Sequence, residues 1–183
     1  MKHYFFSRII GMVFLAAVSI SCTSNLDFNQ ASDIAAKPII VANLATFDIP
    51  ASQFVVGGTE PTVFGDVQNF DVFRDTFFRN NLIKTEFYFE INNTINRDYT
   101  INLELRDAND SPLYTISINV PAYKGTGVST KVTKTETFEN ANLDLLKSTV
   151  KIAFDITRTS GSGSINSGSL KLSSSATVYL DIK

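Results

Sequence analysis

The sequence predicts an all-β fold, an antiparallel immunoglobulin-like β-sandwich of about eight strands with a short helical turn near 140–147. Three observations support this prediction. Apolar and polar residues alternate with a period of two in several segments, which is typical of strands with one buried face. Turns rich in Asn, Asp, Gly, Ser and Pro separate these segments. No long segment has the apolar spacing of a helix.

The clearest alternation occupies residues 83–92, and a second alternating segment occupies residues 99–106. Because only a short polar turn separates them, the two segments are expected to form an antiparallel hairpin. The preferred register places Glu86 opposite Arg106, since opposite charges attract across a strand pair. The other register would place Glu86 opposite Glu104. The residues expected to face the core are Ile83, Thr85, Phe87, Phe89, Ile91, Tyr99, Ile101, Leu103 and Leu105.

The rest of the chain continues the strand pattern and contains one helical segment. Residues 140–147 are expected to form one or two helical turns, with Asn140 as the N-cap and Leu143 and Leu146 facing the core. The last two strands are expected to form a second hairpin, joined by the Gly/Ser-rich loop 159–169. The remaining strands are expected at residues 39–41, 54–56, 114–120, 128–138, 150–156 and 170–182.

The composition limits the chemistry that the protein can perform. His3 is the only histidine and Cys22 the only cysteine among 183 residues. Nucleophilic sites that need an imidazole, and zinc or iron sites that need His or Cys ligands, are therefore not expected in the mature chain. The scattered Lys and Arg residues form no continuous basic face, so nucleic acid is not an expected partner. We predict that the protein is not an enzyme and uses no cofactor or metal.

The first 21 residues have the layout of a secretory signal peptide. Lys2 and Arg8 supply positive charge, and removing them with the signal changes the net charge from −2 to −4. Residues 9–20 form an apolar stretch of 12 residues, whereas a membrane-spanning helix needs about 20. The expected organisation is a signal at 1–21, a polar tether at 22–36 and the sandwich at 37–183.

Residues Ser19-Ile20-Ser21-Cys22 resemble the lipobox that ends a bacterial lipoprotein signal, as found in Bacteroidetes-like bacteria. The resemblance implies that Cys22 carries acyl chains such as palmitate, which would hold the protein on a membrane. Thr23 is not the aspartate that retains many lipoproteins in the inner membrane, so the resemblance implies the outer membrane. It leaves open whether the protein faces the periplasm or the cell surface.

A second resemblance covers residues 87–109, whose strand–turn–strand pattern around asparagines is similar to that of LEA-14-like sandwiches. This resemblance implies the same kind of β-sandwich. It carries no function, because one fold supports many activities.

Two groups of acidic residues have ordinary structural explanations. Asp107, Asn109 and Asp110 crowd one turn, but Ser111 and Pro112 follow them in place of the glycine and further acids of a calcium loop. Glu86 and Glu90 would lie about 13 Å apart along a strand. The paired carboxyl groups of glycosidases are about 5–9.5 Å apart. Both groups are therefore interpreted as solvated turn and sheet surface.

Aromatic residues are concentrated between Phe64 and Phe89. Exposed aromatic clusters mark protein contacts or sugar-stacking surfaces, so part of this segment is a candidate partner surface. The alternative is that a sandwich without tryptophan fills its core with phenylalanine. The candidates for the partner surface are Phe73, Phe77, Phe78 and Tyr88.

These observations lead to an expected function. The protein is expected to be a non-catalytic lipoprotein of the outer membrane that acts as an accessory or scaffold subunit of a cell-envelope complex. Such a complex would assemble outer-membrane proteins, secrete proteins or take up nutrients, and the expected partner is an outer-membrane β-barrel or another envelope protein. The alternative is a module that binds glycans or other surface ligands through the outward tyrosines Tyr88, Tyr123 and Tyr179.

Overall fold

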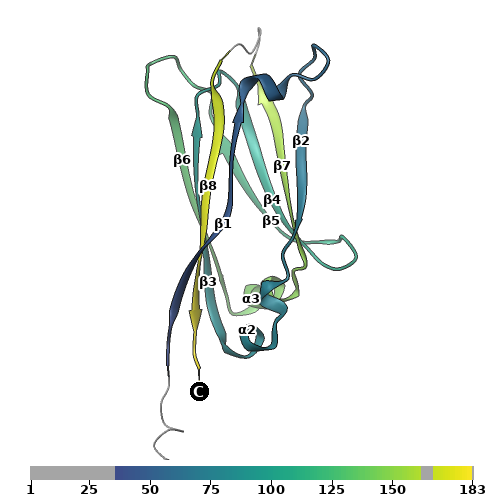
Figure 1. Cartoon of the computed structure of the whole chain (residues 1–183), viewed down its shortest axis with the longest axis vertical. Helices are drawn as coiled ribbons and strands as arrows, with labels where there is room; N and C mark the ends of the chain where they lie inside the picture. Colours follow the sequence, from purple (N-terminus) through teal and green to yellow (C-terminus); the bar gives the residue numbers. More distant parts are fainter. Residues whose placement is uncertain (1–35, 162–166, 183) are drawn as a thin grey trace, which may run out of the picture. The chain divides into compact units, whose positions relative to one another are not determined.

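Two four-stranded antiparallel sheets pack face to face in the computed structural model, which describes residues 36–161 and 167–182 (Figure 1). Residues Ala36–Ile182 form one compact unit, and Cys22 lies outside the described residues. The sheets have the strand orders β1-β8-β3-β6 and β2-β7-β4-β5. The strands are β1 (Ile39–Pro50), β2 (Val63–Asn69), β3 (Leu82–Asn93), β4 (Asp98–Arg106), β5 (Pro112–Val120), β6 (Thr130–Glu139), β7 (Lys151–Ser160) and β8 (Ser169–Leu180).

The predicted eight-stranded antiparallel sandwich is confirmed, and its strand order is that of a double-sheet jelly roll. In an immunoglobulin constant-type domain, strands A, B, E and D share one sheet and strands C, F and G the other. Here six of the seven connections between strands cross from one sheet to the other, and only the β4–β5 connection stays within a sheet. Strands that are neighbours in the sequence are therefore rarely paired.

This crossing makes both predicted hairpins wrong. The segments 83–92 and 99–106 belong to β3 and β4, which lie in different sheets. β3 pairs with β6 and β8, whereas β4 pairs with β5 and β7. The loop 159–169 likewise connects β7 of the second sheet to β8 of the first.

The buried side chain of Asn93 explains why the turn after β3 does not close a hairpin. Its Nδ2 donates to the carbonyls of Arg97 and Pro121, and its Oδ1 accepts from the Ile95 amide, each at 2.9 Å. These bonds fix a turn that carries the chain from the first sheet to the second. They also satisfy backbone groups that burial would otherwise leave unpaired.

The separation of β3 from β4 also changes the predicted charge pairing. Glu86 lies in the first sheet, where it contacts Lys84 at 2.7 Å. Arg106 lies in the second sheet and contacts Glu104 at 2.7 Å. The preferred register with Glu86 opposite Arg106 is therefore wrong.

The predicted alternation of faces is confirmed in β3, β4 and β8, whose inward side chains fill the space between the sheets. Ile83 is an exception, since an irregularity in the β3–β8 register between Leu82 and Lys84 leaves its side chain exposed. The buried side chains of these strands include Thr85, Phe87, Phe89, Ile91, Tyr99, Ile101, Leu103, Leu105, Leu170, Leu172, Val178 and Leu180.

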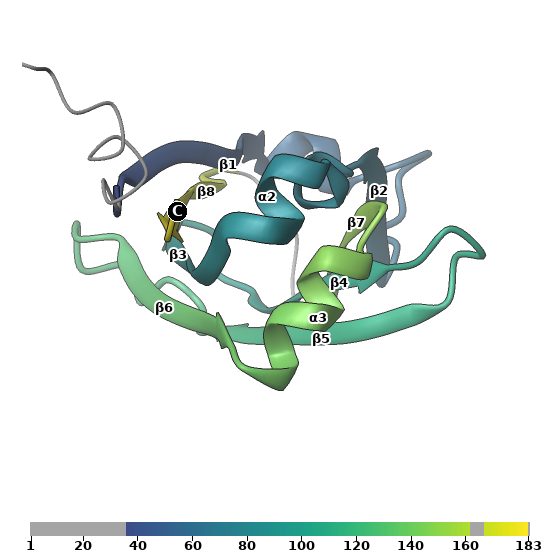
Figure 2. The same ribbon diagram turned by 90° about the horizontal axis from the view of Figure 1, so that it is seen from below.

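Two α-helices, α2 (Thr76–Asn81) and α3 (Ala141–Ser148), lie at one end of the sandwich (Figure 2). The prediction of α3 is confirmed, and Leu143 and Leu146 are buried as expected. Asn140 occupies the N-cap position but its side chain makes no capping hydrogen bond, so that detail of the prediction is wrong. α2 was not predicted.

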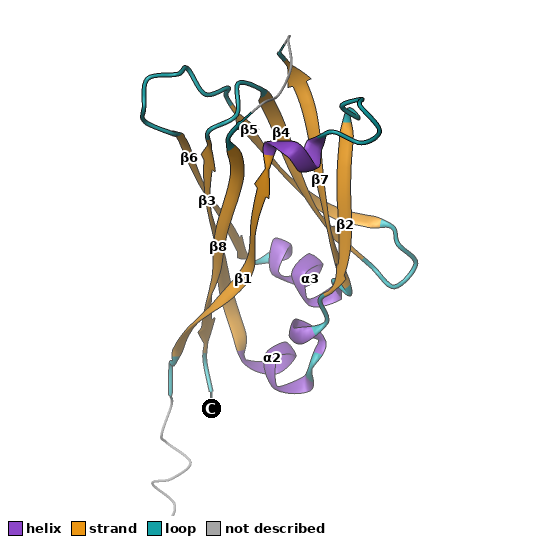
Figure 3. Ribbon diagram, turned by 45° about the horizontal axis from the view of Figure 1, so that its top comes forward, coloured by secondary structure: helices purple, strands orange, loops and turns teal. Residues whose placement is uncertain are grey.

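Two 3₁₀ helices, η2 (Ala51–Phe54) and η3 (Val72–Arg74), complete the secondary structure of residues 36–161 and 167–182 (Figure 3). The strand predicted at residues 54–56 is wrong, because η2 follows β1 directly and buries Ala51 and Phe54. No helix among the described residues is long and apolar enough to cross a membrane.

Candidate functional site

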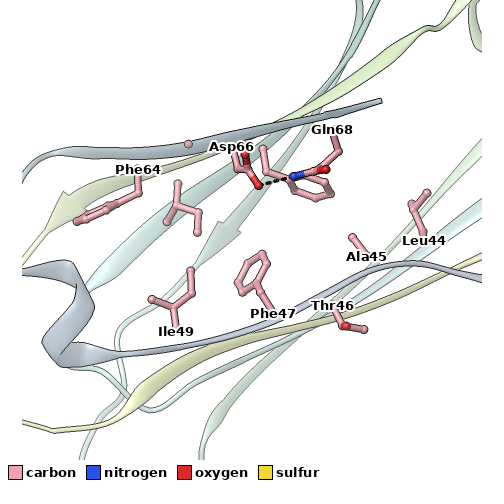
Figure 4. A pocket seen from close by; sticks show the side chains of 11 residues that line it. Leu44, Ala45, Thr46, Phe47, Ile49, Phe64, Asp66 and Gln68 are labelled. Atoms are coloured by element: carbon pink, nitrogen blue, oxygen red, sulfur yellow. Dashed lines mark hydrogen bonds between the residues drawn. The ribbon is translucent and has the colours of Figure 1, made fainter. Parts of the chain in front are cut away.

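A cleft of about 470 Å³ lies between β1 and β2 (Figure 4). These strands are the edges of the two sheets on one side of the sandwich, and they are not paired with each other. On the opposite side the edge strands β5 and β6 contact each other. On the β1–β2 side the cleft reaches the apolar interior, and its apolar lining consists of Leu44, Ala45, Phe47, Ile49, Phe64, Phe154 and Ile156.

A β-bulge in β1 shapes one wall of the cleft. Asn43 is opposite Ser175 and Thr46 is opposite Ser173, so Leu44 and Ala45 share a single partner, Ser174. A bulge of this kind redirects side chains along a strand. Figure 4 shows Ala45 pointing to the same side of β1 as Phe47 and Ile49, toward β2, whereas Thr46 points away.

The bulge is held by a buried hydroxyl group. The Oγ of Ser174 donates to the Ala45 carbonyl at 2.7 Å and accepts from the Ala45 amide at 3.0 Å. Ser174 itself is buried, with 6% of its surface exposed. One side chain thus satisfies both backbone groups of the bulged residue, which the β-ladder cannot pair.

β2 forms the opposite wall and carries the charge of the cleft. Asp66 is the only charged residue among the described residues that line it. Its Oδ1 accepts from the Val67 amide at 2.8 Å, and its Oδ2 accepts from the Gln68 side chain at 2.7 Å. Gly65 lies so close to β7 that a Cβ there would be 2.5 Å from Oδ1 of Asp155. A side chain at position 65 would therefore displace β2 or Asp155.

A second candidate surface lies at the end of the sandwich where α2 is found. There the Leu180 amide donates to the Pro38 carbonyl just before β1, and the Asp181 amide donates to the Asn81 carbonyl at the end of α2. These bonds bring together the start of β1, α2 and the start of β3. We call the exposed large side chains on these elements and on η3 the apolar end: Ile39, Ile40, Val41, Val72, Phe77 and Ile83.

The predicted partner-surface residues divide between core and surface. Phe73 is buried, with its ring centroid 5.6 Å from Phe70 and 5.8 Å from Phe78. Phe78 is half-buried beside it, and Phe77 on α2 is 44% exposed. The structure therefore brings Phe73, Phe77 and Phe78 together, and of these three only Phe77 is exposed. Phe77 and Phe78 are adjacent on α2, and the ring of Phe78 is the one that packs against Phe73.

The outward tyrosines do not form one aligned row. Tyr88 is 40% exposed on β3, and its hydroxyl donates to Glu90 at 3.3 Å. Tyr179 on β8 donates to Glu86 at 2.8 Å. The Tyr123 hydroxyl lies in the β5–β6 loop and accepts from the Gly127 amide. Two of the three tyrosine hydroxyls are thus bonded to carboxylates of their own sheet.

The acidic residues considered for chemistry are engaged in ordinary contacts. Hydrogen bonds from Lys84 and Tyr179 hold the pKa of Glu86 below its usual value, and Lys131 does the same for the pKa of Glu90. Oδ1 of Asp107 accepts from the amides of Asn109 and Ser111 within its own turn. Among the described residues, no group of three or more His, Cys, Asp or Glu is placed to hold a metal ion.

A buried ionic cluster lies next to β4. Glu60 Oε2 accepts from Arg97 Nε at 3.3 Å and forms an ion pair with Arg158 Nη1 at 2.7 Å, and the Arg97 side chain is 1% exposed. The neighbouring Tyr99 hydroxyl is buried without a hydrogen-bond partner. Burial and the negative charge of Glu60 raise the pKa of Tyr99 to about 12.

No protein-family model and no curated protein matches the chain. It is structurally similar to the VP2 protein of an infectious bursal disease virus subviral particle, with 12% identity and a TM-score of 0.46 over 79% of this chain and 33% of that chain. A Parabacteroides distasonis protein described as secreted has 18% sequence identity and a TM-score of 0.38, and the match covers 63% of this chain and 38% of that chain. The structure of PfGH50B has 17% sequence identity and a TM-score of 0.44, and the match covers 78% of this chain and 22% of that chain. The chain spans less than two fifths of each of these proteins.

Proposed function

We propose that the protein is a non-catalytic outer-membrane lipoprotein, anchored through Cys22, that acts as an accessory or scaffold subunit of a cell-envelope protein complex. The observation that carries this proposal is the apolar end. Its six large apolar side chains are each more than 40% exposed, and they come from elements that the described contacts bring together. Exposed apolar side chains gathered on one part of a surface are characteristic of protein contacts.

The apolar end also has the composition of a binding surface. Phe77 supplies an aromatic ring, and the ring of Phe78 lies against it with a centroid distance of 5.5 Å. A ring that is supported on one side and exposed on the other is a suitable anchor for a partner's pocket. The apolar end adjoins the first described residue, Ala36, whose amide donates to the Ile182 carbonyl. A partner bound there would lie near the proposed tether and therefore near the membrane.

Co-purification tests this proposal. The full chain, tagged after Lys183, would be isolated in mild detergent from cells that naturally produce it, and its companions identified by mass spectrometry. We expect one envelope protein to co-purify with the wild type and to be lost with Val41→Asp and Phe77→Asp. Val128→Asp is the matched control, because Val128 is 73% exposed in the β5–β6 loop and outside the apolar end. A wild type without companions, or companions that survive both variants, would contradict the proposal.

A second candidate function is a ligand-binding module of the envelope. The observation that favours it is the cleft between β1 and β2, which has a volume in the range of about 300–1,000 Å³ that is usual for small-molecule sites. The tyrosine positions do not add to this candidate, because their hydroxyls are already bonded within the protein.

A further inference from the structure

We propose that the cleft between β1 and β2 binds a single-chain amphiphile with a neutral or cationic head group. The apolar tail would lie between the two edge strands against Phe47, Ile49 and Phe154, and the head group would donate hydrogen bonds to Asp66 at the mouth. This inference goes beyond the accessory role, since it concerns a different part of the molecule and a different class of partner.

The first step of the argument is the lining of the cleft. Most of its wall is apolar, and Phe47 and Ile49 point across it toward β2 in Figure 4. The cleft reaches Phe154 and Ile156 of β7, so its floor is part of the core. A flexible hydrocarbon tail would fit such a site because it removes apolar surface on both sides from water.

The second step is that both edges of the cleft are unsuited to an added β-strand. An incoming peptide strand would need a regular row of free amides and carbonyls. On β1 the bulge at Leu44 and Ala45 interrupts the regular spacing of that row. On β2 the Val67 amide is already bonded to the Asp66 side chain. Bulges and edge charges of this kind are typical of edges that resist strand addition.

The third step is the charge at the mouth. Asp66 is the only charged group among the described lining residues, and Gln68 is bonded to it. A carboxylate has about four acceptor positions, so Asp66 can accept further hydrogen bonds beside those from Val67 and Gln68. An ammonium, hydroxyl or amide head group would meet this acceptor favourably. A carboxylate or phosphate head group would meet a like charge.

Binding of three probes that share one chain length tests the proposal. Residues 23–183 would be produced without the lipid, since Ala36–Ile182 is a compact unit with its own core. Dodecylamine, dodecanol and dodecanoic acid would be titrated below their aggregation concentrations, with a neutral fluorescent amine as the displaced reporter. We expect saturable binding at one site, with dodecylamine about tenfold tighter than dodecanoic acid. Shortening the amine should weaken binding by about fourfold per methylene.

Two pairs of variants locate the site. Ala45→Phe should fill the cleft and weaken dodecylamine binding at least tenfold, whereas Ala42→Phe, on exposed β1 outside the lining, should not. Asp66→Asn, on β2, should remove most of the preference for dodecylamine over dodecanoic acid. Asp48→Asn should preserve this preference, because Asp48 lies on β1 and outside the lining of the cleft. Thermal unfolding would confirm that each variant is folded.

Three results would overturn the proposal. The first is the absence of saturable binding by the wild type, and the second is equal affinity for the amine and the acid. The third is equal binding by Ala45→Phe and Ala42→Phe. None of these results bears on the co-purification experiment, because the apolar end shares no residue with the cleft.

Discussion

The hydroxyl of Ser174 on β8 bonds both the carbonyl and the amide of Ala45 on β1, at 2.7 and 3.0 Å. The two residues are 129 positions apart in the sequence. The contact joins the last strand of the fold to the first, and it fixes the β-bulge that shapes the cleft. It is thus both a structural bond and a determinant of the candidate site.

Ser174→Ala is expected to lower the free energy of unfolding by about 1–3 kcal/mol, because it leaves buried backbone groups of Ala45 unpaired. Ser175→Ala is the matched control, since Ser175 lies half-buried on the other face of the same strand. It should change the stability by less than about 0.5 kcal/mol. Urea unfolding of both variants measures the difference. Equal stability of the two variants would show that the Ser174 bonds contribute nothing net.

Asn93→Ala is expected to lower the free energy of unfolding by about 2–4 kcal/mol, more than Ser174→Ala. The reason is that three backbone groups in a buried turn lose their hydrogen bonds to the Asn93 side chain. Asn92→Ala is the control, since the half-buried Asn92 side chain makes only long bonds to other side chains, to Glu90 at 3.2 Å and from Ser129 at 3.5 Å. Urea unfolding would be monitored by circular dichroism. Similar midpoints for the two variants would refute the role assigned to Asn93 in the crossing between sheets.

The raised pKa of Tyr99 leads us to expect a loss of stability at high pH. Its folded-state pKa is raised to about 12, whereas a tyrosine in an unfolded chain titrates near 10. The stabilisation is therefore fully present below pH 10 and is lost as the pH rises from 10 through 12, by about 2–3 kcal/mol in total. Tyr99→Phe should remove this part of the pH dependence, while the exposed Tyr88→Phe should retain it. Unfolding free energies at pH 9 and pH 11.5 provide the measurement.

Cys22→Ala tests the proposed anchor. Wild-type protein from the native host is expected to incorporate labelled palmitate and to sediment with membranes, because acyl chains on Cys22 would bury many methylene groups in the bilayer. The variant should lose the label and leave the membrane fraction. Ser24→Ala is the control, since it changes a neighbouring residue without removing the thiol. Equal labelling of wild type and Cys22→Ala would remove the basis for the proposed location.

Much of the secondary structure could be predicted, because the alternation of apolar and polar residues within a strand indicates which of its side chains are buried. The alternation around Phe87 and Phe89 predicted which side chains enter the core, and Leu143 and Leu146 predicted the inner face of α3. Sheet pairing could not be predicted in this way. The choice of partner for β3 depends on the Asn93 turn and on strands that are remote in the sequence.

The candidate cleft could not be predicted for a related reason. β2 has weak alternation, since the cleft-lining positions on it are Phe64, Gly65, Asp66 and Gln68. The bulge in β1 shifts the period of that strand by one residue, so its inward side chains do not follow a single pattern. The sequence offered only a weak signal for Asp66, which is a single charged residue preceded by Val63, Phe64 and Gly65 and followed by Val67.

The position of β8 between β1 and β3 has a consequence for biogenesis. β8 follows all the other strands of the described residues, so β1 and β3 lack the strand that lies between them until β8 has been synthesised. Contacts between such distant segments form slowly. The edges of β1 and β3 that face β8 would therefore stay unpaired in the nascent chain, which would need protection from aggregation until β8 is available.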